Sequence, residues 1–369
     1  MRIAFDQQVF LLQEYGGISR YVCSLAKAMS RIPEAKAKIF APLHFNRHLE
    51  QLAHSDLVWG WRIPRIPRTS RLIFSLSGHL AHIAIKNFRP NIVHETYFST
   101  ADFVPRGAKR VVTVYDMIHE RFASMWPGSE VTTAAKKTAV TRADHVICIS
   151  ESTRRDLLDM FDIPEHKVSV VYLGYDALAT ADVMDTMLPE ITPTPFLLYV
   201  GSRVVYKNLE GLLRAVASSQ FLKNNFSIIC FGGGAFTRDE VALIDGLGLE
   251  ARNVQQMGGG DDVLARLYQG AEAFIYPSLY EGFGIPPLEA MSLGCPVICS
   301  NTSSLPEIVD DAGEYFDPGN TESICVAIET VMQSQARRDD LVEKGRKRCA
   351  VFSWGRCANE TMAIYRSLM

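Results

Sequence analysis

Residues 273–291 read AFIYPSLYEGFGIPPLEAM. The segment opens with four apolar residues, Ala273–Tyr276, of the kind found in a strand that is buried on both faces. The glycines on either side of Phe283 allow the backbone to turn tightly and to approach a ligand. The proline pair that follows suits the first turn of a helix. The segment therefore predicts a strand, a glycine-rich loop and a helix in succession.

The same pattern recurs along the chain. Short runs rich in Val, Ile, Phe and Cys predict buried strands at Arg2–Phe5, Ala37–Ala41, Ile92–His94, Val111–Tyr115, His145–Ile149, Val168–Tyr172, Phe196–Val200, Ser227–Phe231, Ala273–Tyr276 and Pro296–Cys299. Segments with helical spacing lie between them, at Ser19–Met29, Ser152–Phe161, Leu209–Ala217 and Thr321–Met332. Alternating strands and helices predict a doubly wound α/β fold with parallel sheets.

Two domains are expected in a chain of 369 residues. The set of strands restarts near Phe196, and the segment Tyr175–Pro195 carries three prolines and little apolar periodicity, as a linker would. The prediction is therefore two Rossmann-like domains, residues 1–178 and 190–350, facing each other across a cleft. Ligands of such sheets bind at the carboxyl ends of the strands.

Composition excludes several classes of protein. Hydrophobic residues make up 47% and charged residues 21% of the chain, as in globular proteins, and a net charge of −3 gives no basic field for nucleic acid. None of the eight cysteines forms a C-x-x-C pair, which favours reduced thiols in a cytosolic protein. The chain has no signal-peptide pattern and no apolar run of ~18 residues, so we expect a cytoplasmic location and only peripheral membrane contact.

Two carboxylates stand out in the opening segment. Glu281 lies on the predicted loop and Glu289 within the first turns of the helix, whose amino end attracts anions such as a diphosphate. The carboxylates could bind the hydroxyls of a sugar and a ribose. The alternative is an ordinary turn with a solvated Glu281 and a Glu289 that stabilises the helix dipole.

A second motif, residues 200–208, reads VGSRVVYKN and follows the first strand of the second half. Arg203 and Lys207 suit phosphate oxygens, and fixed cations stabilise a leaving nucleoside diphosphate as its negative charge develops. The alternative is a pair of solvated cations beside a helix start, where the helix dipole disfavours them.

Two further motifs follow strands of the first half. Gly16 and Gly17 permit close backbone approach at a helix start, although they do not form a dinucleotide fingerprint. Residues 114–120, VYDMIHE, carry Asp116 and His119, either of which could deprotonate an acceptor hydroxyl. The alternatives are a plain glycine turn, an Asp116 that caps a turn and a structural His119.

The segment from Glu281 to Glu289 resembles the E-x7-E motif of the retaining glycosyltransferases of family 4, which have the GT-B fold. The resemblance extends to residues 303–307, SSLPE, and to the glycine loop near the amino end, and so covers most of the chain. It implies that Glu281 contacts the donor sugar and Glu289 the ribose. It also implies that a last helix, within residues 353–369, crosses back onto the first domain.

The resemblance assigns roles to other residues as well. Phe283, Gly284 and Ile285 would supply backbone amides to the donor, and Arg203 and Lys207 would bind its diphosphate. The loop of Gly16 and Gly17 would close over the phosphates. The family usually has His-Asp where this chain has Tyr115 and Asp116, so His119 is a candidate to replace the missing imidazole. The runs 232–234 and 258–260, each GGG, are expected to be flexible loops at strand ends.

No cofactor and no metal are expected. A metal-dependent transferase would need a D-x-D pair to hold a divalent cation on the diphosphate, and this chain has none. Arg203 and Lys207 would then take the place of the metal.

Residues 59–71, WGWRIPRIPRTSR, combine tryptophans with Arg62, Arg65 and Arg68. Such a stretch suits an anionic membrane surface or the diphosphate of a lipid-linked acceptor. The alternative is an ordinary surface loop whose tryptophans pack inward.

The predicted activity is retaining, metal-independent transfer of a hexose from a nucleotide-diphosphate sugar to a glycan or a polyprenyl-linked acceptor. Resemblance to mannosyltransferases of bacterial surface polysaccharide synthesis makes GDP-mannose the first choice of donor and an O-antigen or capsule chain the first choice of acceptor. Two alternatives are a nucleotide-sugar epimerase of GT-B fold and a non-catalytic nucleotide-sugar-binding partner in polysaccharide assembly.

Overall fold

The computed structural model describes residues 1–52, 55–66, 68–178, 195–250 and 253–369. They form two compact units: unit 1 comprises residues 1–174 and 352–369, and unit 2 comprises residues 175–351. Most of the predicted linker, residues 179–194, lies outside the described residues. The exact domain boundaries therefore stay a prediction.

Unit 1 is built on a sheet of seven strands in the order β3-β2-β1-β4-β5-β6-β7. Every neighbouring pair runs parallel. The strands are β1 (Arg2–Phe5), β2 (Lys36–His44), β3 (Val58–Arg62), β4 (Ile92–Glu95), β5 (Lys109–Val114), β6 (His145–Cys148) and β7 (Val168–Val170). All four residues of β4 and of β6 are buried, as expected of strands covered on both faces.

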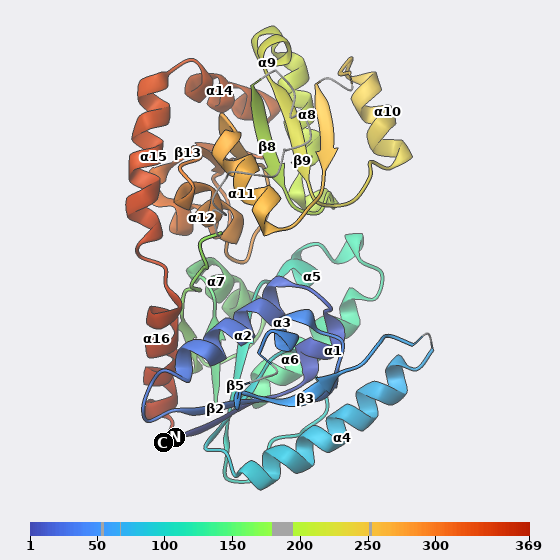
Figure 1. The fold of residues 1–369 in the computed structure, drawn as a ribbon, viewed down its shortest axis with the longest axis vertical. Helices are drawn as coiled ribbons and strands as arrows, with labels where there is room; N and C mark the ends of the chain where they lie inside the picture. The colour runs from blue at the N-terminus through green and yellow to red at the C-terminus, as the bar shows by residue number, and fades with distance from the viewer. Residues whose placement is uncertain (53–54, 67, 179–194, 251–252) are drawn as a thin grey trace. The chain divides into compact units, whose positions relative to one another are not determined.

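The helices of unit 1 connect these strands and cover the sheet (Figure 1). They are α1 (Gln8–Leu12), α2 (Gly17–Met29), α3 (Arg47–Glu50), α4 (Ser70–Phe88), α5 (Ile118–Arg121), η1 (Ala123–Met125), α6 (Ser129–Arg142), α7 (Glu151–Met160), η2 (Glu165–Lys167) and α16 (Trp354–Ser367). Among the described helices, none is both long and apolar enough to cross a membrane.

The last helix, α16, packs against α2 and is anchored in the core of unit 1. The hydroxyl of Tyr365 lies 2.5 Å from Nδ1 of His94, whose Nε2 lies 2.8 Å from Oγ1 of Thr113. The amino group of Met1 donates to the carbonyl of Glu34, whose carboxylate pairs with Arg366. The two ends of the chain therefore lie side by side (Figure 1).

Unit 2 has a second parallel sheet, in the order β10-β9-β8-β11-β12-β13. Its strands are β8 (Phe196–Val200), β9 (Ser227–Phe231), β10 (Val254–Met257), β11 (Ala273–Tyr276), β12 (Val297–Ser300) and β13 (Gly313–Phe316). Its helices are η3 (Val205–Lys207), α8 (Leu209–Ser218), α9 (Gln220–Asn225), α10 (Arg238–Gly246), α11 (Asp261–Gly270), α12 (Ile285–Ser292), α13 (Leu305–Val309), η4 (Asp310–Ala312), α14 (Thr321–Met332) and α15 (Gln335–Cys349).

Aliphatic side chains of the central strands and of the covering helices form the core of unit 2, including Leu197, Leu212, Ile228, Ile275 and Ile328.

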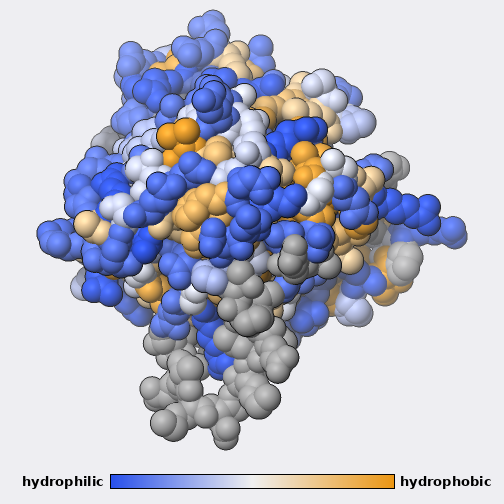
Figure 2. Space-filling view, turned by 90° about the horizontal axis from the view of Figure 1, so that it is seen from above, coloured by the Kyte–Doolittle hydropathy of each residue, from blue (hydrophilic) through white to orange (hydrophobic). Residues whose placement is uncertain are grey.

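The face of the molecule in Figure 2 is mainly hydrophilic, and its hydrophobic patches are small and separate. Scattered apolar residues of this kind are normal on a water-exposed surface.

The predicted fold class is confirmed, since both units have parallel sheets with helices between the strands. Every predicted strand and helix is present within a few residues of its expected ends. The strands β3, β10 and β13 were not predicted. They lie at or near sheet edges, where polar and glycine residues interrupt the apolar run.

The loop expected as the alternative for residues 59–71 is wrong at both ends of this stretch, whereas residues 63–66 and 68–69 belong to no helix or strand. Val58–Arg62 is an edge strand paired with β2, and α4 begins at Ser70. A Cβ at Gly60 would lie 1.7 Å from the carbonyl oxygen of Ala41, so the glycine permits this pairing although glycine is a poor strand former. Trp59 packs inward, as the alternative predicted for both tryptophans, whereas Trp61 is exposed.

Strand order reverses once in each sheet. In unit 1 the reversal lies between β1 and β4, and in unit 2 it lies between β8 and β11. The loops after two such strands diverge to opposite faces and leave a crevice, where open α/β sheets bind ligands.

The buried contact of His94 predicts a pH-dependent stability. Burial lowers the pKa of His94 to about 3, and an unfolded histidine titrates near about 6.5. Between these values only the unfolded chain binds the proton, so this contribution to stability is present above the unfolded pKa and is lost as the pH falls toward the folded pKa. Lowering the pH from 7 to 5 should therefore reduce the contribution of His94 to the free energy of unfolding by about 2 kcal/mol.

Urea unfolding of unit 1 in the full chain, measured at both pH values, tests this. His94→Gln should reduce the loss on acidification by about that amount relative to the unmodified protein, whereas His79→Gln, on an exposed face of α4, should leave it unchanged. An equal loss in His94→Gln and in the unmodified protein would contradict the assignment.

Candidate active site

The reversal point of unit 2 holds a buried charged cluster. The Nζ of Lys207, on the loop after β8, donates to Oε1 of Glu281 at 2.6 Å and to the hydroxyl of Tyr276 at 3.0 Å. The side chains of Lys207 and Glu281 are only 14% and 10% exposed. Lys207, Tyr276 and Glu281 form what we call the Lys207 cluster, which joins the loops after β8 and β11.

Tyr276 is an uncharged member of this cluster. Burial raises the pKa of Tyr276 well above 10, and the charge of Glu281 raises it further. The phenol therefore keeps its proton at neutral pH. Lys207 and Glu281 supply one charge of each sign, so the cluster is close to electrically neutral as it stands.

Backbone contacts hold the loop that carries Glu281. The amide of Leu279 donates to the carbonyl of Tyr206 at 2.7 Å, which ties the two loops together. The amide of Glu281 donates to Oγ of Ser303 at 2.9 Å. The hydroxyl of Ser304 lies within 3.0 Å of the carbonyl of Glu281 and 2.6 Å of that of Phe283. The carboxylate is therefore presented on a backbone with little freedom.

Gly284 sets the start of α12. Its φ of +123° lies in the region that favours glycine, and a Cβ there would lie 3.1 Å from the side chain of Leu305. The predicted amide donors Phe283, Gly284 and Ile285 thus lie at the amino end of this helix, where N–H groups lack intrahelical partners. Phe283 itself is buried.

Glu289 lies inside α12 and is buried. The hydroxyl of Tyr268 donates to its Oε2 at 3.5 Å, which is long for a hydrogen bond. Burial raises the pKa of Tyr268 well above 10, with a further contribution from the charge of Glu289. Glu289 thus sits within unit 2 rather than on its surface.

Arg203 is held in the same unit by a separate partner. Its Nε donates to Oε1 of Glu240 at 2.7 Å, and its side chain is 4% exposed. The guanidinium also donates to the carbonyls of Gly232 and Ala235, each at 2.8 Å, and lies over the ring of Phe236. The alternative of solvated cations is therefore wrong for Arg203, because its charge is buried and paired.

Residues 232–234 form a loop directly after β9, as expected, and this loop also contacts Arg203. Three successive glycines there have φ values of +94°, +71° and +74°, which turn the carbonyls of this loop toward Arg203. Glu240 belongs to the same structure, because it forms the capping box at the start of α10 with Thr237. The sequence signal was present in the spacing of Thr237 and Glu240, but nothing local linked that pair to Arg203.

In unit 1, Asp116 and His119 lie on the loop and short helix after β5. Oδ1 of Asp116 accepts from the amide of Ile118 at 3.1 Å, so this carboxylate caps the turn, as the alternative proposed. The ring of His119 lies 5.9 Å from that of Trp126. Both residues are partly exposed.

Tyr115 occupies the position where the family usually has histidine. It is buried, and its hydroxyl donates to the carbonyl of Thr96 at 3.0 Å. Burial raises the pKa of Tyr115 well above 10, and the nearby hydroxyl of Tyr21 adds to the rise. Tyr115 is therefore a structural residue that keeps its proton at neutral pH.

A buried ion pair that the sequence did not reveal supports this loop. Nζ of Lys136, on α6, donates to Oε2 of Glu120 at 2.6 Å and to the carbonyl of Asp116 at 2.9 Å. Lys136 is buried, and it lies too far along the chain from Asp116 for a local motif to indicate the contact.

The glycine loop lies at the start of α2. The amide of Ser19 donates to Oε1 of Gln13 at 3.1 Å, and Oγ of Ser19 donates to the carbonyl of Gly16 at 3.0 Å. Gly17 has open space around the position of a Cβ and is exposed. The backbone of Gly17 is thus accessible, whereas Gln13 already satisfies part of the helix start.

The three arginines suggested for an acceptor or a membrane differ in their contacts. Arg62 pairs with Glu50 at 3.1 Å and with Glu14 at 3.4 Å. Arg65 donates to the carbonyl of Leu12 at 3.2 Å and lies over the ring of Phe45. Arg68 is exposed and has a φ of +68°.

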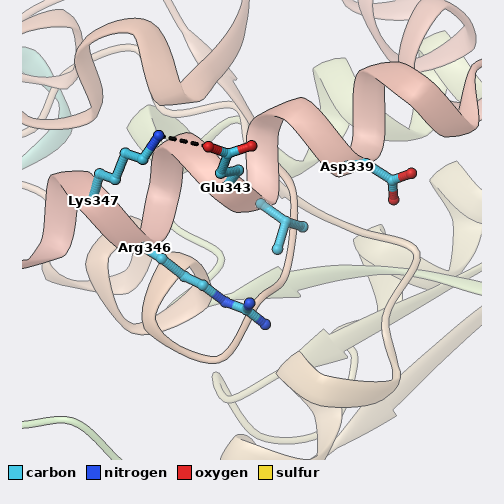
Figure 3. A pocket seen from close by; sticks show the side chains of 5 residues that line it. Asp339, Glu343, Arg346 and Lys347 are labelled. Carbon is cyan, nitrogen blue, oxygen red and sulfur yellow. Dashed lines mark hydrogen bonds and ion pairs between the residues drawn. The ribbon is translucent and has the colours of Figure 1, made fainter.

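A surface hollow of about 480 Å³ lies elsewhere in unit 2, on α15 (Figure 3). Lys347 and Glu343 pair there at 2.6 Å, and both are exposed. The hollow contains none of the predicted donor-binding residues. Among the described residues, no three His, Cys, Asp or Glu side chains are grouped so as to hold a metal ion.

Comparison with known proteins identifies the class. Residues 15–177 match the family model "Glycosyltransferase Family 4", and residues 187–348 match "Glycosyl transferases group 1". The chain is 28% identical to the O-antigen chain mannosyltransferase B of Escherichia coli, over 95% of this chain and 96% of that protein. It is 24% identical to the O-antigen chain mannosyltransferase RfbU of Salmonella typhimurium, over 86% and 87% of the two chains.

Solved structures give the same fold. The sucrose-phosphate synthase of Thermosynechococcus elongatus superposes with a TM-score of 0.76 at 20% identity, over 100% of this chain and 99% of that one. WaaG, a glycosyltransferase involved in lipopolysaccharide biosynthesis, gives 0.71 at 16% identity, over 98% and 99%. The two family models together cover most of the chain. The chain therefore belongs to glycosyltransferase family 4 and has the GT-B fold.

Proposed function

We propose that this glycosyltransferase transfers a hexose, with mannose from GDP-mannose as the first candidate, to a growing surface glycan carried on a lipid. The observation that carries the proposal is the Lys207 cluster at the strand-order reversal of unit 2. The relatives named as O-antigen mannosyltransferases support the choice of sugar and acceptor.

The donor diphosphate would bind beside Lys207 and Arg203. Both cations already have carboxylate partners, Glu281 and Glu240, so a phosphate oxygen would join or displace an existing ion pair. This arrangement avoids leaving two buried cations uncompensated when no donor is bound. The amino end of α12 would provide further N–H groups to the diphosphate.

The reaction would proceed by attack of the acceptor hydroxyl on the face of the sugar that the diphosphate leaves. The bond from the anomeric carbon to the phosphate oxygen breaks, and its electron pair departs with the nucleoside diphosphate. A new bond from the acceptor oxygen forms with retention of configuration. Lys207 and Arg203, fixed beforehand, would stabilise the charge on the leaving group in place of a metal.

The acceptor proton would pass to Asp116 or His119. Tyr115 is a poor choice, because it is buried and its proton is engaged with the carbonyl of Thr96. The contact of Lys136 with the carbonyl of Asp116 would hold this loop in place.

A peripheral membrane contact would use Arg68 together with exposed apolar residues of α4. Leu72, Leu76 and Ile83 are 71%, 47% and 46% exposed, and they recur at spacings that place them near one another on the helix. Arg62 and Arg65 already have partners within unit 1 and would contribute less.

Donor binding tests the proposal most directly. Thermal unfolding of the full chain with GDP-, UDP-, ADP- and dTDP-sugars should show a raised midpoint with one class, because a ligand that binds only the folded state stabilises it. An epimerase would convert its donor with no acceptor present. A non-catalytic partner would bind the donor without transfer or hydrolysis.

Removing the cations should slow the reaction. Lys207→Ala and Arg203→Ala should each lower kcat by on the order of 10²–10³, as expected for loss of a group that stabilises developing charge. The measurement is release of nucleoside diphosphate with the donor identified above. Arg214→Ala is the matched control, since Arg214 is an exposed cation on α8 that pairs with Glu210 of the same helix. Undiminished turnover in Arg203→Ala would remove that residue from the leaving-group role.

A further experiment tests whether transfer needs a metal ion. The initial rate of transfer should be unchanged after treatment with excess EDTA and should not rise when Mg²⁺ or Mn²⁺ is restored. A requirement for either ion would show that the two cations do not replace a metal.

The acceptor base can be assigned with isosteric changes. Substituting the true base, by Asp116→Asn or His119→Gln, should reduce transfer by on the order of 10²–10⁴. Loss of the base should also flatten the limb of the pH–rate profile that reflects ionisation of that base. Tyr115→Phe should retain most activity, because it removes only one hydrogen bond to a backbone carbonyl. Normal rates in both the Asp116 and His119 variants would exclude this loop as the source of the base.

A further inference from the structure

Glu240, in the first turn of α10, is the counter-ion of Arg203. Its Oε1 accepts from Nε of Arg203 at 2.7 Å, and its Oε2 lies 3.3 Å from Nη2 of the same guanidinium. The side chains of Arg203 and Glu240 are 4% and 19% exposed, so salt screens this ion pair less than it screens an exposed pair. The negative charge of Glu240 therefore acts almost where the positive charge of Arg203 does.

Glu240 carries its full charge at neutral pH. Its partial burial raises the pKa of the carboxyl, but hydrogen bonds from the Arg203 guanidinium and from the amide of Thr237 outweigh burial and hold that pKa below its ordinary value. A carboxyl with a lowered pKa is ionised throughout the neutral range. Arg203 thus has a permanent counter-charge before any substrate binds.

Backbone carbonyls occupy most of the remaining N–H groups of Arg203. Nη1 donates to the carbonyl of Gly232 and Nη2 to that of Ala235, each at 2.8 Å. A Cβ at Gly233 would lie 2.5 Å from Nη1, so the glycine lets the loop close on the guanidinium. Each terminal nitrogen of a guanidinium carries two hydrogens, and Nη1 makes one hydrogen bond among the described residues. The second hydrogen of Nη1 is therefore left for a phosphate oxygen.

The carboxylate of Glu240 reduces the attraction between Arg203 and an anion. A diphosphate beside Arg203 meets a cation with a counter-charge next to it, so the net field is smaller than that of a lone guanidinium. The leaving group is more negative once the anomeric bond has broken than it is in the donor, so an uncompensated cation would hold the released nucleoside diphosphate tightly. Release of a product limits turnover in many enzymes.

Lys207 has a similar arrangement with Glu281, but Glu281 is also the candidate for contact with the donor sugar. Replacing Glu281 would therefore change two functions at once. The carboxylate of Glu240 is instead turned toward Arg203 and the amide of Thr237. Its charge can be varied without removing a candidate contact to the sugar.

We propose that Glu240 is a positioning residue that acts through Arg203, and that its negative charge weakens retention of the nucleoside diphosphate after transfer. The carboxylate holds the guanidinium in place for the transition state and compensates its charge when the product leaves. The inference rests on the proposed function, because it assigns a role in product release at the same diphosphate site.

Glu240 also belongs to the capping box of α10, and this structural role can be separated from its charge. Its Oε2 accepts from the amide of Thr237 at 2.7 Å, and its own amide donates to Oγ1 of Thr237 at 3.2 Å. Glutamine serves at this position of capping boxes as well. Glu240→Gln therefore removes the charge with little change of shape, whereas Thr237→Ala loosens the same helix start and leaves the charge in place.

Isothermal titration calorimetry of the full chain with GDP, UDP, ADP and dTDP tests the inference without any need for turnover. Glu240→Gln should bind the preferred diphosphate about threefold to tenfold more tightly than the unmodified protein does, because Arg203 loses its counter-charge. Thr237→Ala should not bind it more tightly. Glu343→Gln, at an exposed position on α15, is the matched control for loss of one negative charge and should bind as the unmodified protein does.

Turnover supplies a second measurement. In Glu240→Gln, inhibition by the nucleoside diphosphate product should strengthen by the same factor and the steady-state kcat should fall, whereas the rate of a single turnover should not fall. Loss of helix structure alone would instead slow the single turnover and weaken binding of the product.

Weaker or unchanged affinity in Glu240→Gln, or an equal increase in Thr237→Ala, would overturn the proposal. Its failure can be told apart from failure of the proposed function. If the unmodified protein bound none of the four diphosphates, the proposed function would fall and the inference with it. If transfer were normal in the unmodified protein and lost in Lys207→Ala, while Glu240→Gln gained no affinity, the inference alone would be refuted.

Discussion

Reversal of strand order in each sheet is the constraint on which the rest of the structure depends. Where consecutive connections turn to opposite faces, the loops after two adjacent strands separate and leave their polar groups unshielded by a helix. In unit 2 this place holds Lys207 and Glu281, and in unit 1 it holds Asp6 and Thr96. Topology brings these residues together although 74 and 90 positions separate them along the chain.

The two reversal points differ in the charged groups that they contain. That of unit 2 contains the buried ion pair of Lys207 and Glu281, whereas that of unit 1 contains the carboxylate of Asp6, which accepts hydrogen bonds from Thr96 and Gln8. An anionic ligand gains most binding free energy where dipoles and cations already face it. A neutral polyol gains most where hydrogen-bond acceptors remain unpaired. The difference in charge supports the proposal that the donor diphosphate binds at unit 2.

Much of the fold could be predicted because the central strands are continuous apolar runs, as in Phe196–Val200 and Ala273–Tyr276, and their bounds agree with the structure. Edge strands such as Val58–Arg62 were not predicted, because they are partly exposed to water and a glycine interrupts the run of apolar residues. Candidate side chains could be selected from local motifs, but their partners could not. Glu240 for Arg203 and Lys136 for Asp116 both come from other elements, and only the folded chain brings them together.

The return of the last helix to the first sheet has a consequence for how this protein is made. Tyr365 fills a buried place beside His94, and Arg366 pairs with Glu34, so the earliest strands to leave the ribosome lack part of their covering until residues 352–369 emerge. Unit 2, by contrast, is one uninterrupted segment and has all its parts before then. Domains usually complete themselves in the order of synthesis. Here unit 2 can finish folding first, and unit 1 keeps apolar surface uncovered until residues 352–369 have been made.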